Sequence, residues 1–395
     1  MRIMREISPA NRISEVSEYY FSVKLREIAQ MNAQGADVIN LGIGSPDLPP
    51  AEDVVSTLGE EASRETSHGY QPYIGIPELR NAFAAWYRRW YGVELDPASE
   101  ILPLMGSKEG IMHISMAFVN EGDAVLVPNP GYPTYTSVSR LVGAKIIPYD
   151  LSAENNWEPD LEALEAQHAA GEIDLNSVKL LWCNYPNMPT GANGSIPLFE
   201  RLVAFGRKYN IIICHDNPYS FILNDKPLSI LMVEGAKDIC IELNSMSKSH
   251  NMPGWRIGML ATNPRFREWI LRVKSNMDSG MFRPLQLAAV KALEQPEEWY
   301  REMNEVYRRR RALAEAILRR VGAEVAPGQV GLFLWGKVDG RGVDICDQVL
   351  YGAKVFLTPG FIFGSNGENY IRISLCANEE TLGRALQRIE KEYNK

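Results

Sequence analysis

The segment Asn244-Ser245-Met246-Ser247-Lys248-Ser249-His250 says most about how this 395-residue chain folds. An apolar run, Ile239–Leu243, leads directly into it, and Arg256 follows eight residues after Lys248. A short apolar run without alternation is typical of a strand that is covered on both faces. In open α/β sheets, the polar residues that follow such a strand lie at the edge where ligands bind. We therefore expect the amine of Lys248 and the guanidinium of Arg256 to face a ligand site.

The surrounding chain alternates apolar runs with helical patterns. Further candidate strands are Ile101–Leu104, Ala124–Val127, Lys145–Pro148, Val178–Cys183, Ile211–Cys214 and Ile257–Ala261. The amphipathic helical patterns between them include Lys108–Val119, Leu161–Ala170 and Ile196–Tyr209. This alternation predicts an α/β fold with a mostly parallel sheet flanked by helices.

The C-terminal part of the chain has a different order of elements. A long helix is expected over Glu297–Arg320, followed by strands and a final helix at Gly331–Trp335, Val355–Leu357, Tyr370–Leu375 and Glu379–Lys391. Strands grouped before a helix are typical of an α+β unit. We predict a large domain over residues 46–296 and a smaller α+β domain formed by residues 1–45 and 297–395.

The composition is that of an ordinary globular protein, with 45% hydrophobic and 23% charged residues. A net charge of −8 argues against nucleic acid as a partner, because clustered Lys and Arg bind phosphate backbones. We interpret the run Arg308–Arg311, which lies among glutamates in the long helix, as a solvated face, with an anion site as the alternative. No window is apolar enough for a membrane span, and the charged N-terminus does not resemble a signal peptide. Five scattered cysteines without a CxxC pair favour a reducing compartment, so we expect a cytoplasmic location.

Polar residues recur at the carboxyl ends of the predicted strands, so one crevice can collect all of them. They are Ser107, Tyr132, Asn187, Asp216, Ser245 and Lys248. Tyr219, three residues after Asp216, adds a phenol. Together they supply what pyridoxal phosphate (PLP) requires, namely a lysine for a Schiff base, an acid for the pyridinium nitrogen, and donors for the ring oxygen and the phosphate. No metal site is expected.

A phosphate site is predicted from three separate pieces of sequence. Gly106-Ser107-Lys108-Glu109-Gly110 opens a helix after a strand, so free backbone N–H groups and the helix dipole face an anion. Ser245 adds a hydroxyl, and Arg256 adds a planar, permanently charged fork. Lys108 is expected to contribute its backbone N–H rather than its side chain. The glycine motif alone is a weak signal, and its combination with Ser245 and Arg256 favours a phosphate.

From about Asn40 to the C-terminus the pattern resembles the class I/II aminotransferases, the fold-type I PLP enzymes. The resemblance implies that Lys248 forms the Schiff base and moves a proton, while Asp216 binds the pyridine nitrogen and Tyr219 the ring oxygen. It also implies that Tyr132 stacks on the ring. Tyr70, in Tyr70-Gln71-Pro72-Tyr73-Ile74-Gly75, would reach the phosphate of a neighbouring subunit, so a homodimer with shared sites is expected. The alternatives are a surface lysine, a turn aspartate and locally packed tyrosines.

One loop departs from the family pattern. Members usually read Asn-Pro-x-Asn-Pro-x-Gly, and the second asparagine supplies an amide to the cofactor. This chain reads Tyr185-Pro186-Asn187-Met188-Pro189-Thr190-Gly191, so Met188 stands at the usual position. We expect Asn187 to take over the amide's role toward cofactor and substrate, with a turn asparagine as the alternative.

Two further residues are predicted to bind the substrate's α-carboxylate. Arg372 lies inside the apolar strand pattern Tyr370–Leu375, where a buried guanidinium requires an anionic partner. A structural ion pair is the alternative. Gly44, in Leu41-Gly42-Ile43-Gly44-Ser45-Pro46-Asp47, would bring its backbone close to the same carboxylate.

We thus predict a PLP-dependent aminotransferase that moves an amino group from an L-amino acid to a 2-oxo acid. The most similar branch contains the prokaryotic aspartate and LL-diaminopimelate aminotransferases, so aspartate or a related donor, with 2-oxoglutarate as acceptor, is a candidate. A carbon–sulfur β-lyase or a decarboxylase on the same scaffold is the alternative. A ligand-binding regulator is disfavoured because no DNA-binding pattern precedes the fold. A nicotinamide-dependent dehydrogenase is disfavoured because the glycine fingerprint is missing.

The residues that read the substrate side chain are harder to predict. For an acidic donor a second cation is required, and Arg283 in Gly280-Met281-Phe282-Arg283-Pro284 is a candidate. The segment Ser14–Lys24 carries Tyr19, Tyr20 and Phe21 together. It either packs on the small domain or forms an apolar lid that excludes water from the site.

Overall fold

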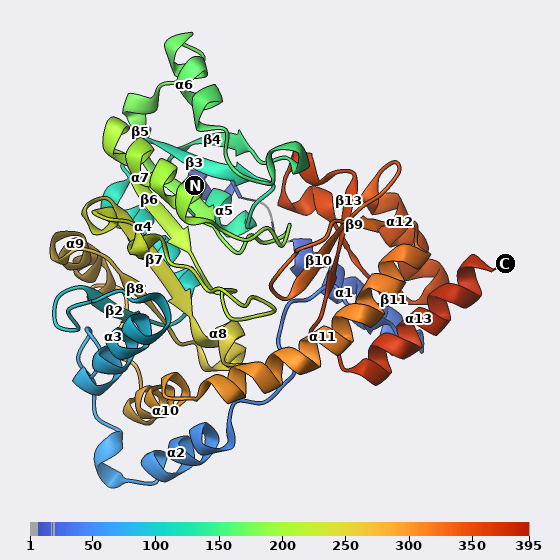
Figure 1. Cartoon of the computed structure of the whole chain (residues 1–395), viewed down its shortest axis with the longest axis horizontal. Coiled ribbons are helices and arrows are strands. Elements are labelled where there is room, and N and C mark those ends of the chain that lie inside the picture. Colours follow the sequence, from blue (N-terminus) through green and yellow to red (C-terminus); the bar gives the residue numbers. More distant parts are fainter. Residues whose placement is uncertain (1–6, 17, 19, 395) are drawn as a thin grey trace, which may run out of the picture.

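A computed structural model describes residues 7–16, 18 and 20–394 of the chain (Figure 1). Its largest element is a seven-stranded sheet with the order β2-β8-β7-β6-β5-β3-β4. These strands are β2 (Ile101–Leu104), β3 (Ala124–Asn129), β4 (Lys145–Asp150), β5 (Val178–Asn184), β6 (Ile212–Asp216), β7 (Cys240–Ser245) and β8 (Gly258–Ala261). Only β8 runs antiparallel to its two neighbours. The predicted α/β fold with a mostly parallel sheet is confirmed.

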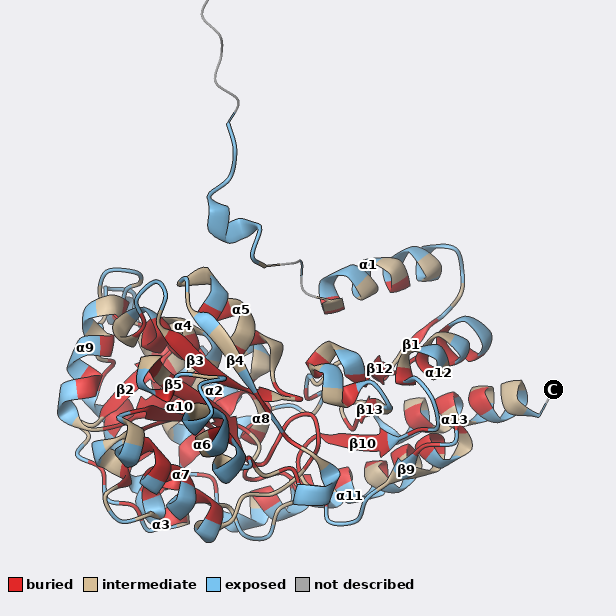
Figure 2. Cartoon of the chain, turned by 90° about the horizontal axis from the view of Figure 1, so that it is seen from above, coloured by how far each residue is buried: buried red, intermediate tan, exposed pale blue. Residues whose placement is uncertain are grey.

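Helices cover both faces of this sheet, which explains why its strands other than the edge strand β4 are buried over almost their whole length (Figure 2). On one face the core contains residues of α4 (Ser107–Phe118), α5 (Pro133–Leu141) and α9 (Pro264–Lys274). On the other face it contains residues of α3 (Pro77–Tyr91), α7 (Ile196–Tyr209) and α10 (Arg283–Leu293). Neighbouring strand residues point to opposite faces, as Leu180 and Leu181 do. Three further helices connect the strands or flank the sheet, namely α2 (Glu52–Ala62), α6 (Leu161–Ala169) and α8 (Met246–Ser249).

A second sheet is formed by the C-terminal part of the chain. Its order is β12-β13-β10-β9, all antiparallel, with β9 (Glu324–Val325), β10 (Phe333–Lys337), β12 (Thr358–Pro359) and β13 (Tyr370–Ser374). The N-terminal strand β1 (Ile39–Asn40) pairs in parallel with β11 (Val355–Phe356). The helices of this part are α1 (Tyr20–Ala33), α11 (Glu297–Arg320), α12 (Gly342–Gln348) and α13 (Glu379–Tyr393). The domain boundaries at residues 46 and 296 stay predictions, and the β1–β11 pairing favours them.

The predicted strands all occur, and their ends differ from the prediction by at most two residues. The helices predicted over Ile196–Tyr209 and Glu297–Arg320 have those bounds in the structure. None of the described helices is both long enough and apolar enough to cross a membrane.

The interpretation of Arg308–Arg311 as a solvated helix face is wrong for Arg310. Its side chain is buried and forms a two-pronged ion pair with Asp47, while it also donates to the Leu375 carbonyl. The helical period explains the difference, because Arg310 lies on the side of α11 that packs against the chain. The other three arginines pair with Glu305, Glu379 and Glu315. The Arg310–Asp47 pair therefore ties α11 to the loop that carries Gly44.

A buried carboxylate joins the large sheet to α3 and to the loop before β7. Glu242 accepts hydrogen bonds from the Tyr87 hydroxyl (2.7 Å), the Ser229 hydroxyl (2.8 Å) and the Ile230 amide (3.0 Å). His215 Nδ1 lies 2.8 Å from the same carboxylate. Because Glu242 is fully buried, these donors replace the water that it loses on folding.

Glu242→Ala is therefore expected to destabilise the protein by about 3 kcal/mol or more, since several buried donors lose their acceptor together. Thermal denaturation should show a midpoint several degrees lower than that of the parent protein. The matched control is Glu200→Ala, which removes an exposed glutamate of α7 and should leave the midpoint unchanged. Equal midpoints for both variants would contradict the structural role of Glu242.

Candidate active site

A cavity of about 490 Å³ opens at the carboxyl ends of the parallel strands of the large sheet. Most of the predicted site residues line it, namely Gly44, Ser107, Lys108, Tyr132, Asp216, Tyr219, Ser245, Lys248, Arg256 and Arg372. Two of them, Asp216 and Ser245, end strands of the large sheet, and the others lie in helices and loops next to the strand ends or come from the two ends of the chain. A cavity of this size with a few converging polar groups is typical of a small-molecule site.

The reversed direction of β8 explains how Arg256 reaches this cavity. Because β8 is antiparallel, the residues just before it lie at the edge where the parallel strands end. Gly258 is paired with Leu104 of β2 and with Ser245 of β7. A Cβ atom at Gly258 would come within 3.2 Å of the Ser107 amide nitrogen, so glycine permits this close approach.

The guanidinium of Arg256 is held by backbone carbonyl groups. It donates to the carbonyl oxygens of Pro253 (2.9 Å) and Met105 (3.4 Å). Gly106 has a φ of +86°, which favours glycine, and a Cβ atom there would lie 2.2 Å from Arg256 Nη2. The glycine of the predicted phosphate motif thus makes room for the arginine.

The start of α4 presents free polar groups beside Arg256. The helix begins at Ser107, with Gly106 as its N-cap. The Ser107 hydroxyl oxygen is buried and has no hydrogen-bond partner among the described residues. Ser245 faces the same cavity and accepts from the Ser247 amide (3.2 Å). Hydroxyls, a guanidinium and a helix N-terminus form an anion site.

Asp216, the last residue of β6, is the acid of the cavity. Its Oδ2 accepts a hydrogen bond from the Tyr135 hydroxyl (2.9 Å), whereas its buried Oδ1 has no partner among the described residues. Burial raises the pKa of Asp216 to about 6, although the hydrogen bond from Tyr135 lowers it. The free oxygen is available to a cationic N–H group of a ligand.

Tyr135 was missed in the sequence analysis. It follows Tyr132 by three residues, so both project from the start of α5, and their rings meet edge to face at 5.5 Å. The Tyr135 ring stacks on Trp182 with 5.1 Å between ring centroids. This packing fixes the hydroxyl that orients Asp216.

Lys248 projects into the cavity from α8 and donates a hydrogen bond to the Gly44 carbonyl. Burial lowers the pKa of its ammonium group, and the charges of Arg372 and Arg256 lower it further. Both effects increase the fraction of neutral, nucleophilic amine. Burial raises the pKa of the Tyr219 phenol, so that residue is a donor at neutral pH.

Arg372 lies in the middle of β13, paired across the sheet with Trp335 and Thr358. Its Nη2 donates to the Gly42 carbonyl (2.7 Å), and its Nη1 to the thioether sulfur of Met188 (3.2 Å). Its guanidinium carbon lies 3.9 Å from the centre of the Phe333 ring. Backbone, sulfur and aromatic contacts thus hold the charged fork at the cavity wall.

The structure does not place the Asn187 side chain, which the sequence predicts as the amide donor, at the cavity. Asn187 does not line the cavity, and its side chain closes its own turn. Its Oδ1 accepts from the Thr190 hydroxyl (2.7 Å), and its Nδ2 donates to the Asn184 carbonyl (3.2 Å). Met188 and Asn184 line the cavity in its place. Because Asn184 donates to the Asp216 carbonyl and accepts from the Met188 amide, its side chain also supports the local backbone.

Two predicted residues lie outside the cavity of their own chain. Tyr70 is 94% exposed. Arg283 forms an ion pair with Glu78 (3.0 Å) and does not line the cavity. The sequence suggested Arg283 only by its distance from Lys248 along the chain, which does not fix the direction of a side chain at the start of α10.

The N-terminal segment contributes directly to the cavity wall. Phe21, Ser22 and Leu25 of α1 line it, so the apolar cover proposed for Ser14–Lys24 is supported in part. Tyr20 packs edge to face on Phe361 (5.7 Å) and follows the alternative interpretation. Tyr19 lies outside the described residues.

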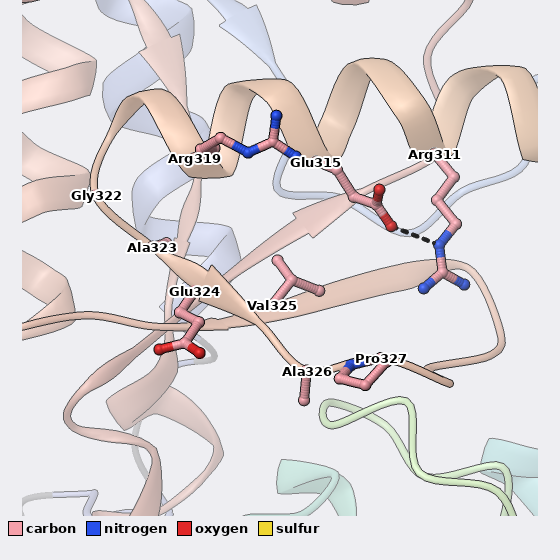
Figure 3. Close-up of a pocket in the computed structure, with 9 residues that line it drawn as sticks. All are labelled: Arg311, Glu315, Arg319, Gly322, Ala323, Glu324, Val325, Ala326 and Pro327. Carbon is pink, nitrogen blue, oxygen red and sulfur yellow. Dashed lines mark hydrogen bonds and ion pairs between the residues drawn. The ribbon is translucent and has the colours of Figure 1, made fainter.

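A second cavity of about 560 Å³ lies between the C-terminal half of α11 and β9 (Figure 3). Arg311, Glu315 and Arg319 line it, and Arg311 pairs with Glu315 at 2.8 Å. It contains none of the predicted site residues, so we assign the chemistry to the first cavity.

A partly buried cluster has the composition of a metal site. Glu109, His113 and Asp278 bring their polar atoms together. However, the ammonium of Lys274 lies 3.0 Å from Glu109 and 2.7 Å from Asp278. A lysine thus supplies the positive charge between the two carboxylates.

Comparison with known proteins agrees with this geometry. Residues 36–389 match the family Aminotransferase class I and II. An LL-diaminopimelate aminotransferase of Nitratidesulfovibrio vulgaris is 39% identical over 98% of this chain and 99% of its own. Another, from Desulforudis audaxviator, is 41% identical over 96% of both chains.

Among solved structures, substrate-bound BacF from Bacillus subtilis superimposes with a TM-score of 0.90 at 34% identity, covering 98% of each chain. Aspartate aminotransferase from Thermotoga maritima gives 0.88 at 29% identity, covering 98% of this chain and all of its own. The chain belongs to the class I and II aminotransferase family. It is an aminotransferase, an enzyme that transfers an amino group between an amino acid and a 2-oxo acid, and this family implies a PLP cofactor.

Asp216→Asn is expected to stabilise the cofactor-free protein above pH 6 and to have little effect below about pH 4. Because the pKa of Asp216 is raised to about 6, the folded protein retains a proton that the unfolded chain, with an ordinary pKa near 4, has lost. Stability therefore falls as the pH rises through this window, by ~3 kcal/mol for about two pKa units. Thermal unfolding of both proteins between pH 4 and 8 measures the difference, and a difference independent of pH would contradict it.

Proposed function

We propose that Lys248 binds PLP as a Schiff base and that the enzyme transfers the amino group of an L-amino acid whose α-carboxylate binds Arg372. The observation that carries this proposal is the pair of buried, unpartnered oxygens, Asp216 Oδ1 and Ser107 Oγ, at the cavity that Lys248 enters. One suits a protonated ring nitrogen, and the other suits a phosphate beside Arg256. The donor set of this cavity therefore fits the cofactor.

The cofactor supplies an electron sink that makes the substrate's Cα–H bond acidic. Asp216 keeps the ring nitrogen protonated, since a carboxylate there favours the cation. Tyr219 donates to the ring oxygen, and Tyr132 covers the ring. Once the substrate amine has taken its place on the cofactor, the free amine of Lys248 would take the Cα proton and deliver it to the cofactor's C4′ carbon, and its lowered pKa favours this transfer near neutral pH.

Arg372 orients the substrate for this proton transfer. A guanidinium binds a carboxylate through two parallel hydrogen bonds, and this geometry fixes the position of Cα. The contacts of Arg372 with Gly42, Met188 and Phe333 fix the guanidinium in turn. Holding the reacting groups in place lowers the entropic part of the barrier.

The names of the relatives suggest LL-diaminopimelate as an amino donor for this chain, and the sequence analysis suggested aspartate with 2-oxoglutarate as acceptor. A β-lyase or a decarboxylase is not favoured, because the family match and the relatives' names are those of aminotransferases. Product analysis separates these reactions, since a β-lyase releases ammonia and pyruvate without any acceptor acid.

We also propose a homodimer in which Tyr70 completes the partner's phosphate site. The support is an exposed apolar surface that includes Tyr70, Tyr73, Met277 and Phe282. The two segments that carry these residues are joined by a bridge between Gln71 and Gly280. Large exposed side chains grouped in this way mark interaction surfaces. The cytoplasmic location remains a prediction that rests on the cysteines, all five of which are free thiols.

Lys248→Ala should abolish amino transfer and remove the lysine–PLP adduct that borohydride traps, because no other amine takes its place. Lys108→Ala is the matched control, since Lys108 lines the same cavity but lies in the first turn of α4, at the proposed phosphate end. Mass spectrometry of the reduced proteins should find the adduct in the control and not in Lys248→Ala. An adduct at the parental level in Lys248→Ala would disprove the assignment.

Mixing inactive Lys248→Ala with inactive Tyr70→Ala should restore activity if the sites are shared. One site of each hybrid dimer lacks both residues, and the other combines an intact Lys248 with the partner's intact Tyr70. Random exchange should therefore recover about a quarter of the parental activity. No recovery after demonstrated subunit exchange would argue that Tyr70 does not act across the interface.

A further inference from the structure

We propose that the cavity selects amino acids with uncharged apolar or aromatic side chains, and that acidic and zwitterionic side chains such as those of aspartate and LL-diaminopimelate are poor substrates. This inference rests on the aminotransfer function proposed above. It concerns the part of the cavity beyond Arg372, where the side chain of a bound amino acid would lie.

The wall of this part of the cavity is apolar. It contains Phe21 and Leu25 of α1, Ile43, Phe333 of β10, and Phe363 of the 3₁₀ turn Gly360–Phe363. The three phenylalanine rings are buried. A substrate side chain that enters here leaves water for hydrocarbon and aromatic surface.

The aromatic rings also surround the guanidinium that would bind the α-carboxylate. The guanidinium carbon of Arg372 lies 3.9 Å from the centre of the Phe333 ring, 4.7 Å from that of Phe363 and 5.7 Å from that of Phe21. A Cβ atom on Gly44 would lie 2.1 Å from the Phe333 ring, so this ring is packed directly on the substrate loop. When the α-carboxylate of a substrate is bound to Arg372, the side chain on the adjacent Cα atom therefore contacts these rings first.

Each charged residue that lines the cavity is already assigned to a role other than binding the substrate side chain. Among the described residues, the charged ones are Lys108, Asp216, Lys248, Arg256 and Arg372. Lys108 and Arg256 lie together at the proposed phosphate end, where burial lowers the pKa of Lys108 and the charge of Arg256 lowers it further. The other three are assigned to the ring nitrogen, the Schiff base and the α-carboxylate. None is left for a charge at the far end of a substrate.

Cations close to this part of the chain are engaged elsewhere. On α1, Lys24 pairs with Glu27 (2.8 Å), and Arg26 pairs with Glu18. Arg310 is closed on Asp47 by two hydrogen bonds. A distal carboxylate would lose water here without gaining a counter-ion, whereas an apolar side chain gains stability when it leaves water. The preference for apolar over acidic donors should therefore exceed ~10-fold.

The first test measures one half-reaction at a time, so that the choice of acceptor does not matter. The holoenzyme is mixed with single amino acids, and the loss of the cofactor's lysine-bound absorbance gives second-order rate constants. Phenylalanine, leucine and methionine should react at least ~10-fold faster than aspartate, glutamate and LL-diaminopimelate. Alanine is the reference, because its methyl group contacts little of the wall. Faster reaction of the acidic donors or of LL-diaminopimelate would overturn the proposal.

Binding without turnover separates this inference from the proposed function. 3-Phenylpropionate and glutarate have a carboxylate but no amine, and calorimetry with the holoenzyme compares their affinities. Tighter binding of 3-phenylpropionate supports the apolar pocket even if no amino acid reacts, in which case the proposed function alone fails. Tighter binding of glutarate overturns the pocket proposal. In that case Arg283→Ala tests whether Arg283, which lies outside the cavity of its own chain, binds the second carboxylate.

Substitution at Leu25 tests the pocket at its entrance. The residue is 39% exposed, so a longer side chain fits there. Leu25→Arg introduces the missing cation and should raise the rate with aspartate relative to phenylalanine by ~10-fold. Leu25→Gln is the matched control, with a polar side chain but no charge, and should not produce this shift. If Leu25→Arg and Leu25→Gln leave the aspartate-to-phenylalanine ratio equal to that of the parent, this wall does not read the side chain and the proposal is wrong.

Discussion

The reversed strand β8 is the constraint on which the cofactor end of the site depends. A purely parallel sheet would deliver only residues that follow strands, whereas β8 also brings the residues that precede it to the same edge. Arg256 reaches the cavity in this way, with its guanidinium fixed by the carbonyl groups of Pro253 and Met105. The close contact of Gly258 with the Ser107 amide then places the start of α4 beside the arginine. The anion site thus follows from strand direction and from two glycines, and it does not depend on a flexible loop.

Much of this arrangement was predictable because short buried strands leave a strong signal. The apolar runs predicted the sheet, and the polar residues after five of them, with the order of Asp216, Tyr219 and Lys248, indicated its ligand-binding edge and the family. The position of a residue along the chain did not predict the direction in which its side chain points. Asn187 and Met188 are neighbours, and only the turn geometry, in which the Asn187 carbonyl accepts from the Gly191 amide (2.8 Å), decides which side chain enters the cavity. Arg310 was misassigned for the same reason, because its partner Asp47 lies far away in sequence.

Met188 changes the chemistry of the loop in a way that its neighbours accommodate. An amide at this position could donate to the cofactor and to a carboxylate, while a thioether can only accept weakly. The Met188 sulfur accepts from Arg372, so the arginine keeps a contact that orients it. Tyr219 is then the phenol that we propose as the donor to the ring oxygen. The site has exchanged a polar contact for a polarizable apolar surface next to the substrate.

The two halves of the cavity come from different parts of the chain. The carboxyl edge of the large sheet and the helices that begin there supply Ser107, Asp216 and Lys248, and we propose that these act on groups common to every reaction. The two ends of the chain supply Phe21, Phe333 and Phe363, and we propose that these contact the part of the substrate that varies. Arg372 lies where the two halves meet, held by Gly42 on one side and by Met188 on the other. The residues proposed for catalysis and those proposed to contact the substrate side chain belong to separate parts of the chain. Substitutions in α1 or around β10 can therefore change the substrate preference without disturbing the Lys248–Asp216 geometry. This separation allows one scaffold to carry different side-chain pockets. An apolar pocket can therefore occur in this chain although its relatives are named for a charged substrate.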